Sequence, residues 1–262
     1  MRRWKTAEKD ELKKMYPEAL KDSILEAFPG RTWGGIKSQA KRMGVVLSRA
    51  NYKSDASALL NESNQAYHWL GFLCADGHFD EGTISLELSS KDLPHLKQFC
   101  DFIGFDQKNI RHRTREAFGG VHQLSVVRIS HKEVVYQVTS RLKLVSNKTK
   151  IPPDLSSLTE SQLLCFFLGF FDGDGTICQR KDGGRNLCLA VDEAWFDTLV
   201  MFKNLLARLD VNTSCNVIRY KNLVTNRTLS RWQTGSAKTF LKLYQAGREL
   251  QLPLMLRKWG SS

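Results

Sequence analysis

The chain is 262 residues long, 42% of it is hydrophobic, and its formal net charge is +12 at pH 7. This composition excludes a disordered or fibrous protein, because it supplies enough apolar side chains for a sizeable core. The basic excess favours a polyanionic partner such as nucleic acid, although a ribosomal protein or a basic membrane-surface protein would show the same balance.

Cysteine usage and the lack of long apolar runs limit the compartment. The six cysteines show no Cys-x-x-Cys spacing, so reduced and buried thiols are expected. The N-terminus, Met-Arg-Arg-Trp-Lys, leads into a polar segment rather than a signal peptide, and no apolar run reaches membrane length. We expect a protein that is neither secreted nor in a membrane, located in the cytoplasm, at the nucleoid or in an organellar matrix.

The first 46 residues predict three short helices, at 7–16, 22–28 and 32–44. Thr32 is a suitable N-cap for the third helix and Gly44 a suitable residue after its end. Apolar residues at steps of three and four predict its core stripe, which consists of Trp33, Ile36, Ala40 and Met43. A basic last helix suits docking into a DNA major groove, and the residues expected to make contact are Lys37, Ser38, Lys41 and Arg42.

Two apolar runs end in the same pattern of a small residue, an aspartate and a glycine. The first reads Trp-Leu-Gly-Phe-Leu-Cys-Ala-Asp76-Gly77, and the second reads Phe-Leu-Gly-Phe-Phe-Asp-Gly-Asp174-Gly175. A run that is apolar on every side predicts a buried helix rather than a surface one. Each copy keeps a glycine, Gly71 or Gly169, at the same distance before its aspartate. Small residues let helices approach closely, so we expect the two runs to pair.

Paired in this way, the helices would place Asp76 and Asp174 side by side at one end. Each carboxylate would meet the negative end of a helix dipole, at a cost of roughly 0.3–1 kcal/mol. Two carboxylates about 5 Å apart also repel by about 3 kcal/mol at an effective dielectric constant of about 20. A divalent cation reverses both effects, and hard oxygen ligands of this kind suit Mg²⁺. The alternative is that each Asp-Gly only opens a β-hairpin after a core helix.

The same order of elements follows each motif. In the first half we predict strands at 83–89, 109–115 and 121–130, and helices at 92–103 and 131–144. In the second half we predict strands at 176–180, 186–192, 214–221 and 227–234, and helices at 193–209 and 237–246. The second half has the order helix-strand-strand-helix-strand-strand-helix, and the first half has the same order except that only one strand is predicted between its motif and the helix at 92–103. This repetition predicts an α+β architecture of two related halves.

The two motifs resemble those of the LAGLIDADG homing endonucleases, in which two copies in one chain mark a monomer. Cys74 departs from the pattern, because it stands where the motif's first acid would be, whereas the second copy keeps Asp172. The resemblance implies two pseudo-symmetric αββαββα halves, 64–150 and 151–262, which form a DNA-binding saddle. Residues 1–46, with Trp4 and Trp33, resemble a small all-α helix-turn-helix domain of the Myb/SANT-like kind. The polar segment 47–63 is predicted to be a linker.

The resemblance also implies where metal would bind. The metal-binding acids are Asp76 and Asp174, together with the carbonyl groups of the residues that precede them, Ala75 and Gly173. Mg²⁺ is the expected cofactor, with Mn²⁺ or Ca²⁺ as substitutes.

A further cation from each half is implied, and it would assist the nucleophile or stabilise charge in the transition state. The best matches by position are Lys148 and Lys258, and the close competitors are Lys150 and Arg257. Ser90 and Glu193 follow the second strand of each half, where relatives place a polar residue near the attacking water.

Basic residues at alternate strand positions predict a cationic sheet face, because alternate residues of a strand share a face. Three sets have this spacing, namely Arg111 with Arg113 and Arg115, Arg219 with Lys221, and Arg227 with Arg231. One DNA-binding face is expected from them, joined by Arg128, Arg180 and Arg185. Trp232 has the opposite parity to Arg231 and is expected in the core.

These features predict a site-specific endonuclease that hydrolyses both strands of an extended double-stranded DNA target. Two other roles stay open. A group I intron maturase would bind intron RNA on the same scaffold, and a regulator of transcription would be a decayed, catalytically inactive nuclease. The retained Asp76 and Asp174 argue weakly against the maturase and more strongly against the inactive regulator.

Overall fold

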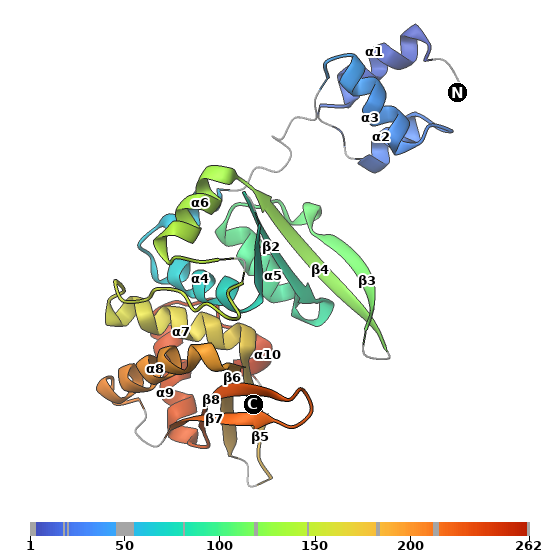
Figure 1. Cartoon of the computed structure of the whole chain (residues 1–262). Coiled ribbons are helices and arrows are strands. Elements are labelled where there is room, and N and C mark those ends of the chain that lie inside the picture. Colours follow the sequence, from blue (N-terminus) through green and yellow to red (C-terminus); the bar gives the residue numbers. More distant parts are fainter. Residues whose placement is uncertain are drawn as a thin grey trace. The chain divides into compact units, whose positions relative to one another are not determined.

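The computed structural model describes residues 4–17, 19, 21–45, 55–80, 82–117, 120–145, 147–181, 184–211 and 215–260. The chain divides into two compact units, Met1–Lys53 and Ser54–Ser262 (Figure 1). Each unit has its own hydrophobic core.

The N-terminal unit contains three helices, α1 (Thr6–Met15), α2 (Lys21–Ala27) and α3 (Trp33–Arg42). The predicted cap of α3 is confirmed, since the Thr32 side chain accepts a hydrogen bond from the backbone N–H of Gly35. Ile36 and Ala40 are fully buried, as the core stripe predicted. They pack with residues of the other two helices, and the buried set is Leu12, Tyr16, Ile24, Phe28, Ile36 and Ala40.

The larger unit is built from two halves of the same topology. The elements of the first half are η2 (Ala56–Leu60), α4 (Asn64–Asp76), β1 (Gly77–Asp80), β2 (Thr83–Ser89), η3 (Ser90–Asp92), α5 (Leu93–Phe102), η4 (Gln107–Asn109), β3 (Arg111–Ala117), β4 (Gly120–Ser130) and α6 (Lys132–Arg141). Those of the second half are α7 (Glu160–Asp174), β5 (Gly175–Gln179), β6 (Arg185–Asp192), η5 (Glu193–Trp195), α8 (Phe196–Arg208), β7 (Asn216–Asn222), β8 (Arg227–Thr234), α9 (Ala237–Glu249) and α10 (Leu256–Trp259).

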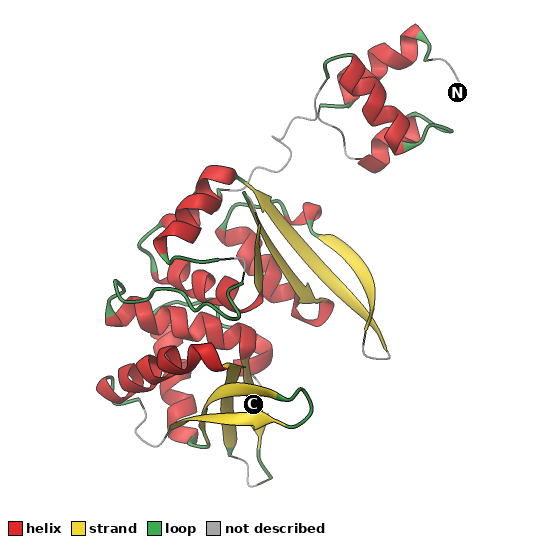
Figure 2. Ribbon diagram, viewed as in Figure 1, coloured by secondary structure: helices red, strands yellow, loops and turns green. Residues whose placement is uncertain are grey.

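Each half holds a four-stranded antiparallel sheet, with the order β1-β2-β4-β3 in the first and β5-β6-β8-β7 in the second. Figure 2 shows the strands of the larger unit gathered in two separate groups, each beside helices. The strand order is the same in both halves once the numbering is shifted by four. The predicted α+β architecture of two related halves is therefore confirmed. None of the helices in the described part of the chain is long and apolar enough to cross a membrane.

Helices α4 and α7 lie against each other at the centre of this unit, and their glycines explain how closely they pack. A Cβ atom at Gly71 would lie 2.0 Å from the backbone oxygen of Phe166, and one at Gly169 would lie 1.8 Å from that of His68. Both distances are far below van der Waals contact. Only glycine is compatible with this approach at either position, so the two helix backbones are in direct contact, as the motif spacing predicted.

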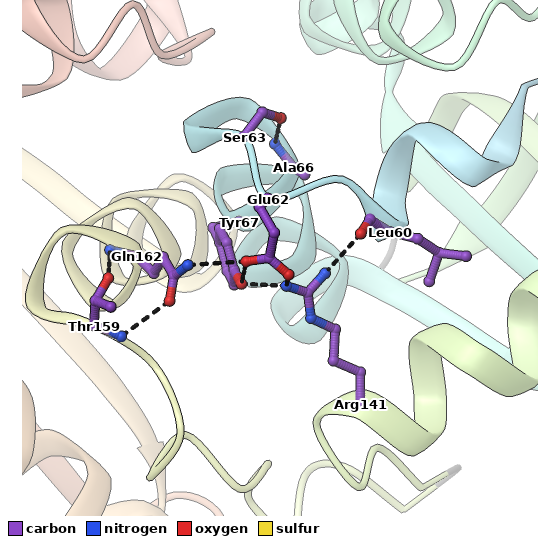
Figure 3. Close-up of polar contacts among 8 residues, drawn as sticks. All are labelled: Leu60, Glu62, Ser63, Ala66, Tyr67, Arg141, Thr159 and Gln162. Carbon is purple, nitrogen blue, oxygen red and sulfur yellow. Dashed lines mark hydrogen bonds and ion pairs between the residues drawn. The ribbon is translucent and has the colours of Figure 1, made fainter.

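The starts of the two helices are tied together by polar side chains (Figure 3). Glu62, just before α4, accepts hydrogen bonds from the hydroxyl of Tyr67 at 2.5 Å and from the amide of Gln162 at 3.0 Å. Arg141 of α6 ion-pairs with Glu62 and donates to the Leu60 carbonyl at 3.1 Å. This network joins α4, α6 and α7 at their shared edge. The two motif helices therefore run in parallel, and their C-terminal ends adjoin.

Three regions differ from the prediction. The strand β1, directly after the first motif helix, was not predicted, although its counterpart β5 in the second half was. Residues 56–60, inside the predicted linker, form the 3₁₀ helix η2, and its Ala56 and Leu59 are buried in the core of the larger unit. The rest of that linker up to residue 54 lies outside the described residues. Near the C-terminus the short helix α10 was not predicted, because its four residues are too few to show a repeating apolar pattern.

Candidate functional site

Asp76 and Asp174 are the last residues of α4 and α7, and Gly77 and Gly175 cap the two helices. Both aspartate side chains reach solvent. A Cβ atom at Gly173 would lie only 3.4 Å from Oδ2 of Asp76, so the Asp76 carboxylate rests against the last turn of the opposite helix. The parallel helix pair thus brings the two acids to one place, as the repeat predicted.

The ionised forms of both acids are disfavoured by their surroundings. Desolvation by the crowded helix ends, followed by the negative charge of Asp174, raises the pKa of Asp76 to about 6. Desolvation also raises the pKa of Asp174, against the opposing effect of two nearby lysines. Two carboxylates in this state are a site that a cation would stabilise.

Lys148 and Lys258, the two predicted cations, lie at the ends of the motif helices. Lys148 Nζ donates to the carbonyl of Cys74 at 2.7 Å and also to that of Ala75. Lys258 Nζ donates to the carbonyls of Gly173 at 2.8 Å and Gly175 at 2.6 Å. Each ammonium group therefore satisfies terminal carbonyls of one helix and opposes the negative end of its dipole.

The pKa of each motif aspartate is lowered more by the lysine that contacts the opposite motif helix than by the lysine that contacts its own helix. The pKa of Asp76 is lowered more by Lys258 than by Lys148, and the order is reversed for Asp174. Desolvation lowers the pKa of both lysines, while the acids oppose that effect. Two acids and two cations therefore form one electrostatic cluster to which both halves contribute.

The competing cations Lys150 and Arg257 are engaged elsewhere. Lys150 Nζ pairs with Asp192 of the second half at 2.6 Å, and Arg257 Nε pairs with Asp92 of the first half at 2.5 Å. Each of these two cations therefore lies near the C-terminal end of one half and pairs with an acid of the other half. Lys148 and Lys258, rather than these competitors, contact the C-terminal ends of the motif helices.

The backbone that carries Lys148 is held by a tryptophan that the sequence did not single out. Trp195 Nε1 donates to the carbonyls of Lys148 at 3.1 Å and Thr149 at 3.2 Å. Its ring stacks on Phe170 of α7, with centroids 4.5 Å apart. The lysine of the first half is thus fixed by the second half.

The donor set at this end of the helices suits a hard divalent cation. Among the described residues no group of three or more His, Cys, Asp or Glu side chains could hold a metal ion. An ion here would have the carboxylates of Asp76 and Asp174 as its protein ligands, with water or phosphate completing its shell. That set matches the preference of Mg²⁺ for one or two carboxylates plus substrate oxygens. The carbonyls of Ala75 and Gly173, which were also predicted as ligands, accept hydrogen bonds from Lys148 and Lys258, so an ion would have to share each of these oxygens with an ammonium group.

In the first half, the arginines predicted to share a sheet face do so. Arg111, Arg113 and Arg115 lie opposite Val126, Leu124 and His122 of β4, and Ser85 lies opposite Arg128. Residues directly opposite each other share a face, so the four arginines line the face away from the buried Val127 and Ile129. All four are exposed, and Arg113 ion-pairs with Glu87 on this face.

In the second half, the prediction of one cationic face is wrong. Arg227 and Arg231 lie opposite Asn222 and Ile218 on the open face. Arg219 and Lys221 lie opposite Ser230 and Thr228, on the face of the fully buried Trp232. The Arg219 guanidinium accordingly stacks over the ring of Phe196 in α8, 3.7 Å from its centroid. The core position predicted for Trp232 is confirmed.

Arg185 also departs from the predicted surface. It lies opposite Gln179, on the helix-facing side of the sheet, and its guanidinium stacks 4.1 Å from the ring centroid of Phe240 in α9. Arg180 is exposed just after β5. On the open face, Arg227 lines a pocket of about 290 Å³ together with Asp174 and Lys148, which connects that face to the acid of the second motif.

The remaining predicted residues lie outside this cluster. Ser90 is half-buried in η3, with its hydroxyl 3.4 Å from that of Ser125. Glu193 is exposed in η5, and its carbonyl accepts a hydrogen bond from Ser230. In the N-terminal unit, the four predicted DNA contacts on or beside α3 are all exposed, namely Lys37, Ser38, Lys41 and Arg42.

Comparison with known proteins gives likenesses of fold. Neither a protein-family model nor a curated protein matches the sequence. The homing endonuclease I-WcaI, bound to its DNA recognition sequence, is similar with a TM-score of 0.52 and 11% identity, over 89% of this chain and 96% of that chain. Mesophilic variants of the homing endonuclease I-DmoI give a TM-score of 0.42 and 11% identity, over 73% and 96% of the two chains. The LAGLIDADG meganuclease I-CpaMI, bound to uncleaved DNA, gives 0.41 and 12%, over 70% and 84%.

The first of these likenesses covers both halves at a TM-score above 0.5, and it agrees with the two four-stranded antiparallel sheets described above. This chain therefore has the α+β fold of the LAGLIDADG homing endonucleases.

Proposed function

We propose that this protein is a site-specific DNA endonuclease that hydrolyses both strands of a duplex target with a divalent metal. The observation that carries the proposal is the pair of solvent-reaching carboxylates, Asp76 and Asp174, on the adjoining ends of two helices in direct contact. Lys148 and Lys258 on the same helix ends add one cation from each half. As both halves belong to one chain, we expect it to act as a monomer.

The roles of the residues follow from their geometry. A divalent cation held by Asp76, Asp174 and the carbonyls of Ala75 and Gly173 would stabilise charge on the scissile phosphate and activate water. Lys148 Nζ and Lys258 Nζ keep positive charge beside the position where negative charge develops. Mg²⁺ is the ion we expect, and Mn²⁺ or Ca²⁺ would occupy the same ligands.

The direct test is conversion of a supercoiled plasmid to linear DNA. The plasmid would carry the uninterrupted sequence into which this reading frame inserts. Linear product is expected with Mg²⁺ and none with EDTA. Metal-independent cleavage, or no cleavage of any duplex, would contradict the proposal, whereas rescue of RNA splicing by a variant lacking both acids would favour the maturase.

The open sheet faces are proposed as the DNA-binding surface, and the register of β7 and β8 makes a matched test possible. Arg227→Ala and Arg231→Ala should each weaken DNA binding by about tenfold and reduce the slope of log K against log salt by about one unit. Arg219→Ala and Lys221→Ala, on the opposite face, should leave both quantities unchanged. Binding measured at several salt concentrations would decide, and equal losses for the two pairs would contradict the assigned face.

The N-terminal unit is proposed as a helix-turn-helix that extends the DNA footprint through the exposed basic residues of α3. Deletion of residues 1–53 removes this unit with its whole core. The remaining chain should cut at the same position, but with weaker binding and a shorter protected region. Nuclease footprinting of the two proteins would check this, and an unchanged footprint would exclude DNA contact by the unit.

A further inference from the structure

Asp172 is a buried acid that the proposed chemistry does not use. It lies on α7 two residues before Asp174, and its side chain is fully buried. The equivalent residue of the first motif is Cys74, which is also buried but is a thiol. The two halves therefore differ at this position, and the difference lies next to the acids.

Three N–H groups converge on the Asp172 carboxylate. Oδ2 accepts hydrogen bonds from the backbone N–H of Met255 at 2.9 Å and from Nε2 of His68 at 3.1 Å. Oδ1 accepts one from the indole Nε1 of Trp259. A buried carboxylate is tolerated only when its oxygens are satisfied in this way. His68 comes from α4, so the same carboxylate also links the two motif helices.

Two of these three donors belong to the segment that carries Lys258. Met255 is the N-cap of α10 and Trp259 is its last residue, directly after the lysine, and both side chains are buried. Lys258 Nζ then reaches the carbonyls of Gly173 and Gly175. Asp172 therefore fixes the backbone on one side of Lys258 and a side chain on the other.

The lysine of the first half has a different anchor. Lys148 is positioned by Trp195, which donates to the backbone carbonyls of Lys148 and Thr149. The Cys74 carbonyl accepts a hydrogen bond from Lys148, which any residue at that position can provide. Disturbing Asp172 should therefore affect Lys258 and leave the anchor of Lys148 in place.

We propose that Asp172 is a positioning residue for Lys258, and that it governs cleavage of one strand of the duplex while the other strand depends on the Trp195 anchor of Lys148. This proposal rests on the proposed nuclease function. It assigns a role to the difference between Asp172 and Cys74, which makes the two halves unequal.

The Asp172→Asn variant tests the proposal, because its amide keeps the volume but cannot accept all three bonds. Whichever way the amide turns, its NH₂ group faces the N–H of either Met255 or Trp259. A displacement of about 1 Å at a catalytic group can cost about 100-fold in rate. We expect the rate on one labelled strand to fall 10- to 100-fold, with the other strand cut at nearly the wild-type rate, so that nicked DNA accumulates. Equal loss on both strands would overturn the proposal.

The double variant Asp172→Asn/Lys258→Met separates positioning from general damage to the fold. If Asp172 acts through Lys258, the double variant should cut no more slowly than Lys258→Met alone, because residues that act as a unit are non-additive. Multiplied losses would overturn the proposal. Leu163→Ala, a core truncation near the start of the same helix, serves as the stability control and should leave the ratio of strand rates unchanged.

A second variant and a structural measurement keep the proposal testable on their own. Trp259→Phe removes one hydrogen-bond donor to Asp172 and retains an aromatic ring, so we expect a smaller loss of cleavage rate on the same strand. This variant replaces Asp172→Asn as the test if that variant does not fold. Hydrogen exchange should become faster in residues 255–260 and stay unchanged in residues 147–150 for either variant. Unchanged exchange at 255–260 in the variants would overturn the proposed anchor. If exchange there is faster in the variants but the wild-type protein cuts no DNA, the anchor stands and the nuclease function is refuted.

Discussion

Replacing Asp76 or Asp174 with Asn is expected to abolish double-strand cleavage while DNA binding persists. Each substitution removes one charged ligand of the proposed metal ion. Because the ion would stabilise negative charge on the scissile phosphate, its loss should slow cleavage on the order of 1,000-fold or more. Neither side chain lies on the open sheet faces proposed to hold DNA. Single-turnover cleavage and a gel-shift titration of the same protein would measure the two effects.

The stability of these variants provides a control with a definite sign. Desolvation and Asp174 raise the pKa of Asp76 to about 6, so the folded state disfavours the charged carboxylate and is destabilised as the pH rises from about 4 to 6. Asp76→Asn removes that charge and should melt at or above the wild-type temperature. A variant that melts lower and loses DNA binding would mean that Asp76 is structural, and an active variant would refute the metal site.

Gly71→Ala and Gly169→Ala are expected to be among the most destabilising single substitutions in the chain. The added Cβ would lie 2.0 Å from the backbone oxygen of Phe166 or 1.8 Å from that of His68, and a backbone atom cannot move aside as a flexible side chain can. The helices would have to separate, at a cost of about 3 kcal/mol or more in the free energy of unfolding. Denaturant unfolding followed by circular dichroism would measure this loss.

A Gly→Ala substitution inside a helix normally stabilises it, so the destabilisation expected here has the opposite sign. A third helical glycine provides the control. A Cβ atom at Gly34 of α3 would meet no side chain or distant backbone atom of the described residues within 4 Å, so Gly34→Ala should stabilise the N-terminal unit by about 0.5–1 kcal/mol. If Gly71→Ala and Gly169→Ala were likewise neutral or stabilising, the close packing of α4 on α7 would be wrong, and with it the proximity of the two acids.

The motif helices and the candidate site at their ends were predictable because their signals are local. An all-apolar run with a fixed glycine predicts a buried helix pair, and an acid at the end of each run must then lie near the other. Lys148 and Lys258 were identified through the family resemblance, and the structure places both on the helix ends.

The face of the second sheet was not predictable from strand parity. Parity decides which residues of one strand share a face, but the turn decides how two strands are matched. Asn222 lies opposite Arg227, and this register puts odd-numbered residues of β7 on the same face as even-numbered residues of β8. Arg219 therefore shares a face with Ser230, and Arg231 shares the other face with Ile218.

The roles of Asp172 and Trp195 depend on contacts between distant parts of the chain. Asp172 meets Met255 from 83 positions away, and Trp195 meets Lys148 from 47 positions away. No periodicity in a single sequence specifies which segment returns to a helix end. From the sequence, Asp172 is distinguished only as an acid at the position where the first motif has Cys74. Trp195 is distinguished only as an aromatic residue that follows a predicted strand.

The central claim is that one chain holds two carboxylates in a single centre that serves both strands. Mapping the cut positions on both labelled strands of one target tests this most directly. Because the acids adjoin, the two scissile phosphates must face each other across one groove, and the cuts should lie within about half a helical turn, roughly 5 base pairs. Cuts a full turn or more apart, or cleavage of both strands by a protein that retains only one of the two acids, would contradict the claim.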